Sequence, residues 1–199
     1  MDVRDFHKDF LEEIKATAAT EGAGSNAAFV EVASAYLVNA EVLSDFTPAF
    51  YLGTGKNNRR IRVDGYVLDE FDMTFNLVIA DYTGDENRDT LTRSVASGFF
   101  DRLMYFIEEV YGSKLHRAVE PSTPVADLIE MMRMYKDRIR KYRLILLTDG
   151  FMSNRINEID AREFNNIPVE CQIWDIDRIF RVCFSDLGRQ DIEIDFKMY

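Results

Sequence analysis

Hydrophobic and polar positions along the chain follow two periods, one helical and one extended. Helical spacing predicts helices at residues 2–18, 26–43, 88–111, 125–141 and 175–184. Alternating or uninterrupted apolar runs predict strands at residues 49–52, 60–69, 74–82, 142–148, 169–174 and 191–196. Because residues 70–73 form a short turn, the strands on either side of it should pair as a hairpin. Strands mixed with long helices favour one α/β domain over residues 1–199, with a mixed central sheet flanked by helices.

Composition narrows the class of protein. Of the 199 residues 47% are hydrophobic, and 15 Phe and 9 Tyr supply a packed core, which argues against disorder. The net charge of −11 lowers the expectation of a nucleic-acid-binding face, which is usually basic. Cys171 and Cys183 lack the paired spacing of a zinc site, and we expect buried, reduced thiols. Without a signal peptide or an apolar span, we expect a cytoplasmic protein that contacts no membrane.

Acidic residues gather around the predicted hairpin. Asp64 lies on its first strand, Asp81 ends its second strand, further acids occupy the turn, and Glu31 lies on the preceding helix. Magnesium is held by a few carboxylates and water, so Glu31, Asp64 and Asp81 are candidate metal ligands and catalytic residues. The alternative is that these acids are only solvated. Asp81 has Arg88 and Arg93 as plausible cationic partners.

A basic segment precedes the Asp64 strand. Lys56, Arg59 and Arg60 follow a glycine-containing turn, and Arg62 lies just beyond them. These four residues are candidates for a phosphate clamp that binds nucleic acid, or they form an ordinary solvated turn. The glycines do not match a P-loop, because no Gly-Lys-Ser/Thr follows a strand.

The histidines, the tryptophan and three methionines are expected to have structural positions and no catalytic role. His7 and His116 lie in no recognisable catalytic motif, and we expect both at the surface. Trp174 stands in an apolar strand and is expected in the core. The three methionines of the helix at residues 125–141 are expected to pack against other elements.

Short motifs along the chain resemble the N-terminal domain of the AIPR (abortive infection phage resistance) family. They are VDGYVLDE at 63–70, FNLVIADY at 75–82, LTDG at 147–150, IWDIDR at 173–178 and IEIDF at 192–196. The resemblance covers roughly residues 5–196. Family members continue into a larger C-terminal part, so we expect this chain to be the N-terminal fragment of a longer bacterial protein.

The resemblance, with the element order, implies a restriction-endonuclease-like (PD-(D/E)xK-type) core with an incomplete motif. In that superfamily, an Asp on the second strand and a Glu-x-Lys on the third hold magnesium and activate water. Asp64 matches the Asp, and Glu31 is a match for a helical Glu. On the third strand, Ile79 stands at the Glu position and Asp81 at the Lys position, so neither supplies the expected chemistry.

The sequence leaves three possible functions open. The first is a degenerate nuclease-like module of a phage-resistance protein that binds nucleic acid or a protein partner. The second is an active metal-dependent nuclease with a rearranged site of Glu31, Asp64 and Asp81. The third is a non-catalytic assembly domain. Candidate partners are nucleic acid, the C-terminal part of the same protein and a second copy of the chain, and magnesium is the candidate cofactor.

Overall fold

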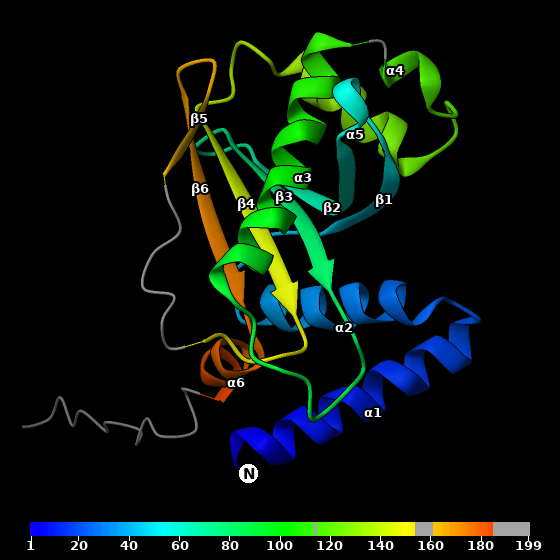
Figure 1. Ribbon diagram of the computed structural model, residues 1–199, viewed down its shortest axis with the longest axis vertical. Coiled ribbons are helices and arrows are strands. Elements are labelled where there is room, and N and C mark those ends of the chain that lie inside the picture. Colours follow the sequence, from blue (N-terminus) through cyan, green and yellow to red (C-terminus); the bar gives the residue numbers. More distant parts are fainter. Residues whose placement is uncertain (114, 154–160, 185–199) are drawn as a thin grey trace, which may run out of the picture.

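A computed structural model describes residues 1–113, 115–153 and 161–184, and its centre is a six-stranded mixed sheet (Figure 1). The strand order is β1-β2-β3-β4-β6-β5. The strands are β1 (Thr47–Thr54), β2 (Arg60–Asp69), β3 (Thr74–Asp81), β4 (Lys141–Thr148), β5 (Arg162–Phe164) and β6 (Ile167–Trp174). The helices are α1 (Val3–Glu21), α2 (Ser25–Asn39), α3 (Arg93–Gly112), α4 (Leu115–Ala118), α5 (Pro124–Met134) and α6 (Ile176–Phe184), with a short 3-10 turn η1 at Lys56–Asn58.

The sheet combines an antiparallel half and a parallel half. Strands β1, β2 and β3 form an antiparallel meander, which confirms the predicted hairpin of β2 and β3. Strands β3, β4 and β6 are parallel neighbours, so a crossover must separate β3 from β4, and α3 supplies it. As a result, the carboxyl ends of β3, β4 and β6 lie at one edge of the sheet (Figure 1).

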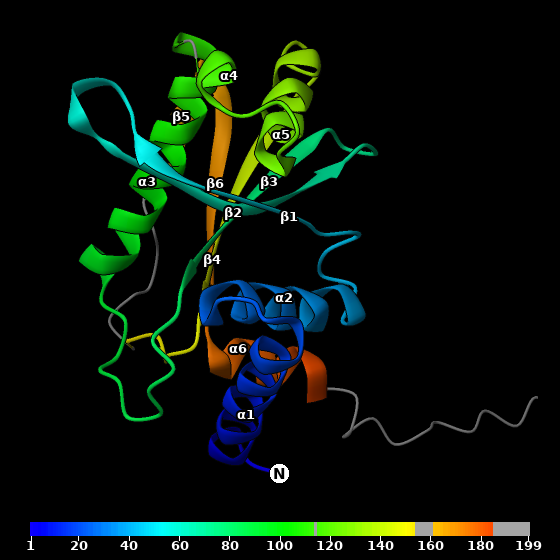
Figure 2. The same ribbon diagram turned by 90° about the vertical axis from the view of Figure 1, so that its right-hand side faces the viewer.

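Two helical groups bury the two faces of the sheet. Helices α3 and α5 cover one face with side chains such as Phe100, Phe106 and Leu128, all fully buried. Helices α1, α2 and α6 pack against β3, β4 and β6 through a second core that includes Phe10 and Phe29, and Figure 2 shows these three helices together. Each large apolar side chain removed from water contributes about 1.5–3 kcal/mol, so these clusters dominate the stability. None of the described helices combines the length and apolarity needed to cross a membrane.

Helices α3 and α5 are shorter than their apolar patterns predict, because backbone hydrogen bonds to distant residues hold the chain beyond their ends. Helix α3 begins at Arg93 and not at residue 88, since the Leu91 amide donates to the Phe151 carbonyl at 2.8 Å and Thr92 caps the helix. Helix α5 ends at Met134, well before residue 141. The Arg140 amide donates to the carbonyl of Met73 at 3.0 Å, which draws the chain into the sheet.

Strand β5 is an element that the hydrophobic pattern missed. It spans only Arg162–Phe164 and pairs antiparallel with β6. Asn165 and Asn166 connect the two strands, with φ angles of 50° and 63°. Asn tolerates this left-handed conformation, and two such residues in succession suit a tight hairpin turn. The predicted strand at residues 191–196 lies outside the described residues.

The predicted burial of individual side chains is confirmed at some positions and wrong at others. Trp174 is 4% exposed, which confirms a core position. Cys171 and Cys183 are free thiols, but both are only partly buried. His7 was expected at the surface and is 2% exposed, because its ring packs against Phe151 in the segment that follows β4. Met134 was expected to pack and is 69% exposed, since it occupies the last position of α5.

Candidate functional site at the carboxyl edge of the sheet

Each of the three parallel strands ends at an aspartate. Asp81 is the last residue of β3, Asp149 directly follows β4, and Asp175 directly follows β6. In open α/β sheets, the carboxyl edge is where ligand-binding side chains converge. The carboxylate of Asp175 accepts hydrogen bonds from the backbone amides of Met152 at 2.7 Å and Arg178 at 2.9 Å. Asp175 therefore caps the beginning of α6.

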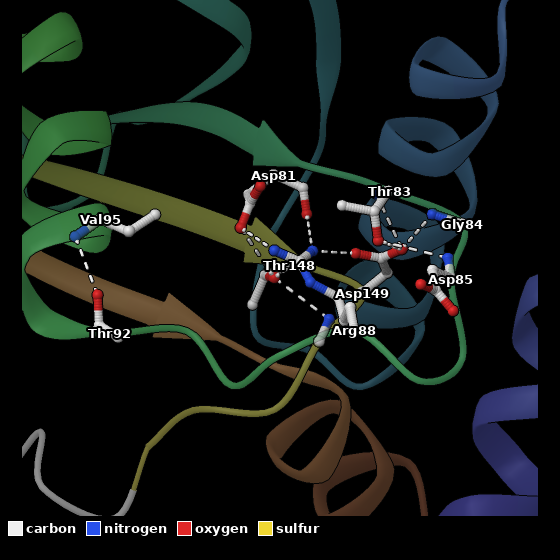
Figure 3. A network of polar contacts seen from close by, with 10 residues as sticks. Asp81, Thr83, Gly84, Asp85, Arg88, Thr92, Val95, Thr148 and Asp149 are labelled. Atoms are coloured by element: carbon white, nitrogen blue, oxygen red, sulfur yellow. Dashed lines mark hydrogen bonds and ion pairs between the residues drawn. The ribbon is translucent and has the colours of Figure 1, made fainter.

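Asp81 and Asp149 are joined by Arg88 (Figure 3). Arg88 Nη2 lies 2.7 Å from Asp81 Oδ2, and Nη1 forms an ion pair with Asp149 Oδ1. The other oxygen of Asp149, Oδ2, accepts from the amides of Thr83 at 3.0 Å and Gly84 at 2.6 Å. The guanidinium therefore ties β3 to β4, and Asp149 also fixes the loop that leaves β3.

This cluster is shielded from water. The side chains of Asp149, Asp81 and Arg88 are 0%, 13% and 14% exposed. Burial alone would lower the pKa of Arg88, but the hydrogen bonds and charges of Asp81 and Asp149 raise it, so the arginine stays charged. Gly150 makes room for it: a Cβ there would lie 2.9 Å from both Cδ and Nε of Arg88.

Buried His7 adjoins the same cluster from α1. Its ring meets Phe151 edge-to-face with 5.6 Å between centroids, and it is hydrogen-bonded to the backbone of Asp149. Burial lowers the pKa of His7, although the negative charge of Asp149 opposes this effect. Within the described part of the chain, Nε2 of His7 has no hydrogen-bond partner.

Asp64 lies outside the Arg88 cluster, and both of its carboxylate oxygens accept hydrogen bonds. Its Oδ1 accepts from Arg62 Nη2 at 2.9 Å and from Asn26 Nδ2 at 3.3 Å, and its Oδ2 accepts from the Ala80 amide at 2.9 Å. The side chain is 2% exposed. Burial raises the pKa of Asp64 despite the opposing charge of Arg62. The carboxylate thus joins α2, β2 and β3.

The pairing of β1 with β2 is irregular close to Asp64. The register of β1 against β2 shifts between Pro48 and Tyr51, opposite the segment of β2 that carries Asp64. Shifts of this kind re-aim the side chains of a strand. The next residue, Gly65, is closely packed: a Cβ there would lie 2.2 Å from Cζ of Phe46.

Glu31 lies apart from both aspartates. It is exposed on α2 and lines, with Glu21, a hollow of about 670 Å³. Partial desolvation and the hydrogen-bonded neighbour Glu21 raise the pKa of Glu31. No group of three or more His, Cys, Asp or Glu side chains that could hold a metal occurs in the described ranges. The three predicted ligands, Glu31, Asp64 and Asp81, are therefore not brought together as a metal site.

The predicted basic segment is divided among several partners. Arg59 pairs with Glu108 at 3.0 Å, and its guanidinium lies 4.6 Å from the centroid of the Tyr105 ring. Arg62 is bound to Asp64. Lys56 and Arg60 are exposed, and neither forms an ion pair with another described residue. These two cations are thus the ones free to meet a phosphate.

The sequence predicts some of the residues that meet at the carboxyl edge of the sheet, but not all of them. The sequence predicts Arg88 as a partner of Asp81, which the ion pair confirms, but Asp149 was not among the predicted site residues. A signal was available in the chain, because three apolar strands each run directly into an aspartate at Asp81, Asp149 and Asp175.

Comparisons with known proteins bear on this site. Residues 29–181 match the family model described as the abortive infection phage resistance protein N-terminal domain. This range includes the Asp64–Arg62 pair, the cluster of Arg88 with Asp81 and Asp149, and all six described strands of the sheet. Searches of curated proteins and of solved structures gave no match.

Proposed function

The chain belongs to the family of abortive infection phage resistance protein N-terminal domains, and from this premise we propose that it is a nuclease-like module that binds nucleic acid without cleaving it. The family suggests an abortive-infection, phage-resistance role. In this proposal the module acts in the cytoplasm.

The element order supports a restriction-endonuclease-like core. Helix α2 is followed by the antiparallel strands β1, β2 and β3, then by α3 and by β4 parallel to β3. This is the order that the resemblance implies for that superfamily. Asp64 lies on the second strand of the meander, where the superfamily carries its aspartate.

One observation carries the non-catalytic part of the proposal. Asp64 and Asp81 are each neutralised by an arginine, Arg62 or Arg88, at 2.9 Å and 2.7 Å. A magnesium ion would have to displace a guanidinium to reach either carboxylate. Ile79, at the position of the missing glutamate, is fully buried in the apolar core and offers no ligand.

Nucleic-acid binding rests on the cations beside this core. Arg60 and Lys56 are exposed, and Arg102 on α3 is close enough to Arg60 and Arg62 for their charges to lower its pKa, after the larger effect of burial. Such a concentration of like charge in a chain of net charge −11 favours an anionic ligand.

The test combines binding and cleavage with the purified chain. We expect labelled duplex or single-stranded DNA to bind, with affinity that falls steeply as salt rises, and to remain intact with Mg²⁺ or Mn²⁺. The variant Lys56→Ala/Arg60→Ala should bind more weakly, whereas Arg59→Ala should change little because Glu108 already neutralises Arg59.

Magnesium should also leave the melting temperature unchanged, both in the parent and in Asp64→Asn. Metal-dependent cleavage that disappears in Asp64→Asn would refute the non-catalytic assignment. Absence of binding to every nucleic acid at low salt would refute the binding assignment and favour an assembly role.

A further inference from the structure

The outer strand β1 carries an uncovered apolar face. Phe50 and Leu52 are each 61% exposed, whereas their neighbours Ala49 and Tyr51 face α3 and α5 and contribute to the core. Exposed large apolar side chains on an edge strand are a liability that proteins usually avoid, so adjacent ones indicate a binding surface.

The sheet register places two arginines on this same face. Leu52 pairs with Arg62, and Thr54 pairs with Arg60, so each pair projects to one side of the sheet. The Arg62 guanidinium lies 5.9 Å from the centroid of the Phe50 ring. An aromatic ring, an aliphatic side chain and two guanidinium groups therefore share one face of β1 and β2.

The arginines differ in how firmly they are held. Arg62 is fixed from below by buried Asp64 and by Asn26, whose Oδ1 accepts from Nη2 at 3.0 Å. Arg60 is exposed and forms no ion pair with any described residue. One guanidinium is thus pre-positioned beside Phe50, and the other is free to meet an anion.

We propose that this face, made of Phe50, Leu52, Arg60 and Arg62, binds single-stranded nucleic acid, with a base stacked on Phe50 and a backbone phosphate at Arg60. The inference rests on the proposed nucleic-acid-binding function and names its substrate class. An exposed aromatic ring beside cations matches an unstacked base and its phosphate. In a duplex, the base faces are occupied by neighbouring bases, so Phe50 would have nothing to stack on.

The experiment measures fluorescence anisotropy of the chain with a labelled oligothymidylate of about 12 nucleotides and with a duplex of the same length. Phe50→Ala should weaken binding of the single strand by about 5- to 150-fold and leave duplex binding unchanged. Arg60→Ala should weaken binding to both and reduce the salt dependence. Phe71→Ala is the matched control, because Phe71 is 100% exposed in the turn between β2 and β3 and should have no effect.

The outcomes separate this inference from the function on which it rests. If Phe50→Ala and Leu52→Ala bind the single strand as the parent does, the inference is overturned and nucleic-acid binding through other cations stands. If neither DNA binds the parent, the proposed function fails as well. If the two variants change only self-association in sedimentation, the face joins two copies of the chain and the inference is wrong.

Discussion

Replacing Asp149 with alanine should destabilise the protein by about 3–4 kcal/mol. The carboxylate is fully buried and accepts from four groups: the Arg88 guanidinium, the amides of Thr83 and Gly84, and the Thr83 hydroxyl. Alanine removes all four acceptor contacts at once. It also leaves part of the Arg88 charge without compensation in a site that water reaches poorly.

The size of this loss of stability depends on the contacts that Arg88 and Thr83 keep after Asp149 is removed. Breaking a buried ion pair by deleting one partner costs about 3–5 kcal/mol. Arg88 keeps Asp81 at 2.7 Å, and Thr83 is exposed, so water can replace its lost acceptor. These two facts place the loss at the lower end of the range. Asp149→Asn, which keeps the shape and one acceptor oxygen, should have a smaller effect.

Urea denaturation followed by circular dichroism measures the loss. With a slope of about 2 kcal/mol per molar urea, the midpoint should fall by about 1.5–2 M at unchanged slope. Glu108→Ala is the control, because its pair with Arg59 is nearly half exposed on both sides and should contribute less than about 1 kcal/mol. A loss for Asp149→Ala no larger than for this control would refute the view that the Arg88 cluster holds β3 and β4 together.

Two further predictions concern the same edge. Because burial lowers the pKa of His7 below its ordinary 6.5, the unfolded chain takes up a proton first as pH falls, and stability declines below pH 6.5. In urea titrations at several pH values, His7→Gln should lose part of this decline, and an identical pH dependence would contradict the assignment. Arg88→Ala leaves Asp81 and Asp149 as neighbouring carboxylates without their shared cation, so Mg²⁺ should raise the melting temperature of this variant and not of the parent. Equal responses in thermal unfolding would show that the guanidinium does not occupy a cation position.

The sequence predicted the fold class well because local patterns and tertiary packing agree in the central strands. Strands β3 and β4 contain the apolar runs at residues 77–80 and 144–147, and both runs are entirely buried. The hairpin of β2 and β3 followed from the short turn at residues 70–73 between an alternating strand and an apolar strand. Helix boundaries failed where long-range hydrogen bonds compete with helical periodicity, as at Leu91 and Arg140.

The candidate site was harder to predict, because its chemistry depends on distances that a sequence does not contain. Glu31, Asp64 and Asp81 were grouped as carboxylates on and near the predicted hairpin, but each faces a different environment. Arg62 is two residues from Asp64 in the chain, and nothing in that spacing shows that its guanidinium turns back onto the carboxylate. The pairing depends on Asn26 of α2, which approaches from another part of the chain.

In the nuclease-like core that we propose, the two arginines supply the positive charge that a metal ion would otherwise provide. In a metal-dependent site, carboxylates on neighbouring strands repel one another until a cation binds between them. Here Arg88 supplies positive charge to Asp81 and Asp149, and Arg62 supplies it to Asp64, so each carboxylate is stabilised when no metal is bound. At the carboxyl edge of the sheet, the ion pairs of Arg88 with Asp81 and Asp149 join β3 to β4. With this edge closed by internal ion pairs, the exposed cations and the uncovered face of β1 are the surfaces left for a partner.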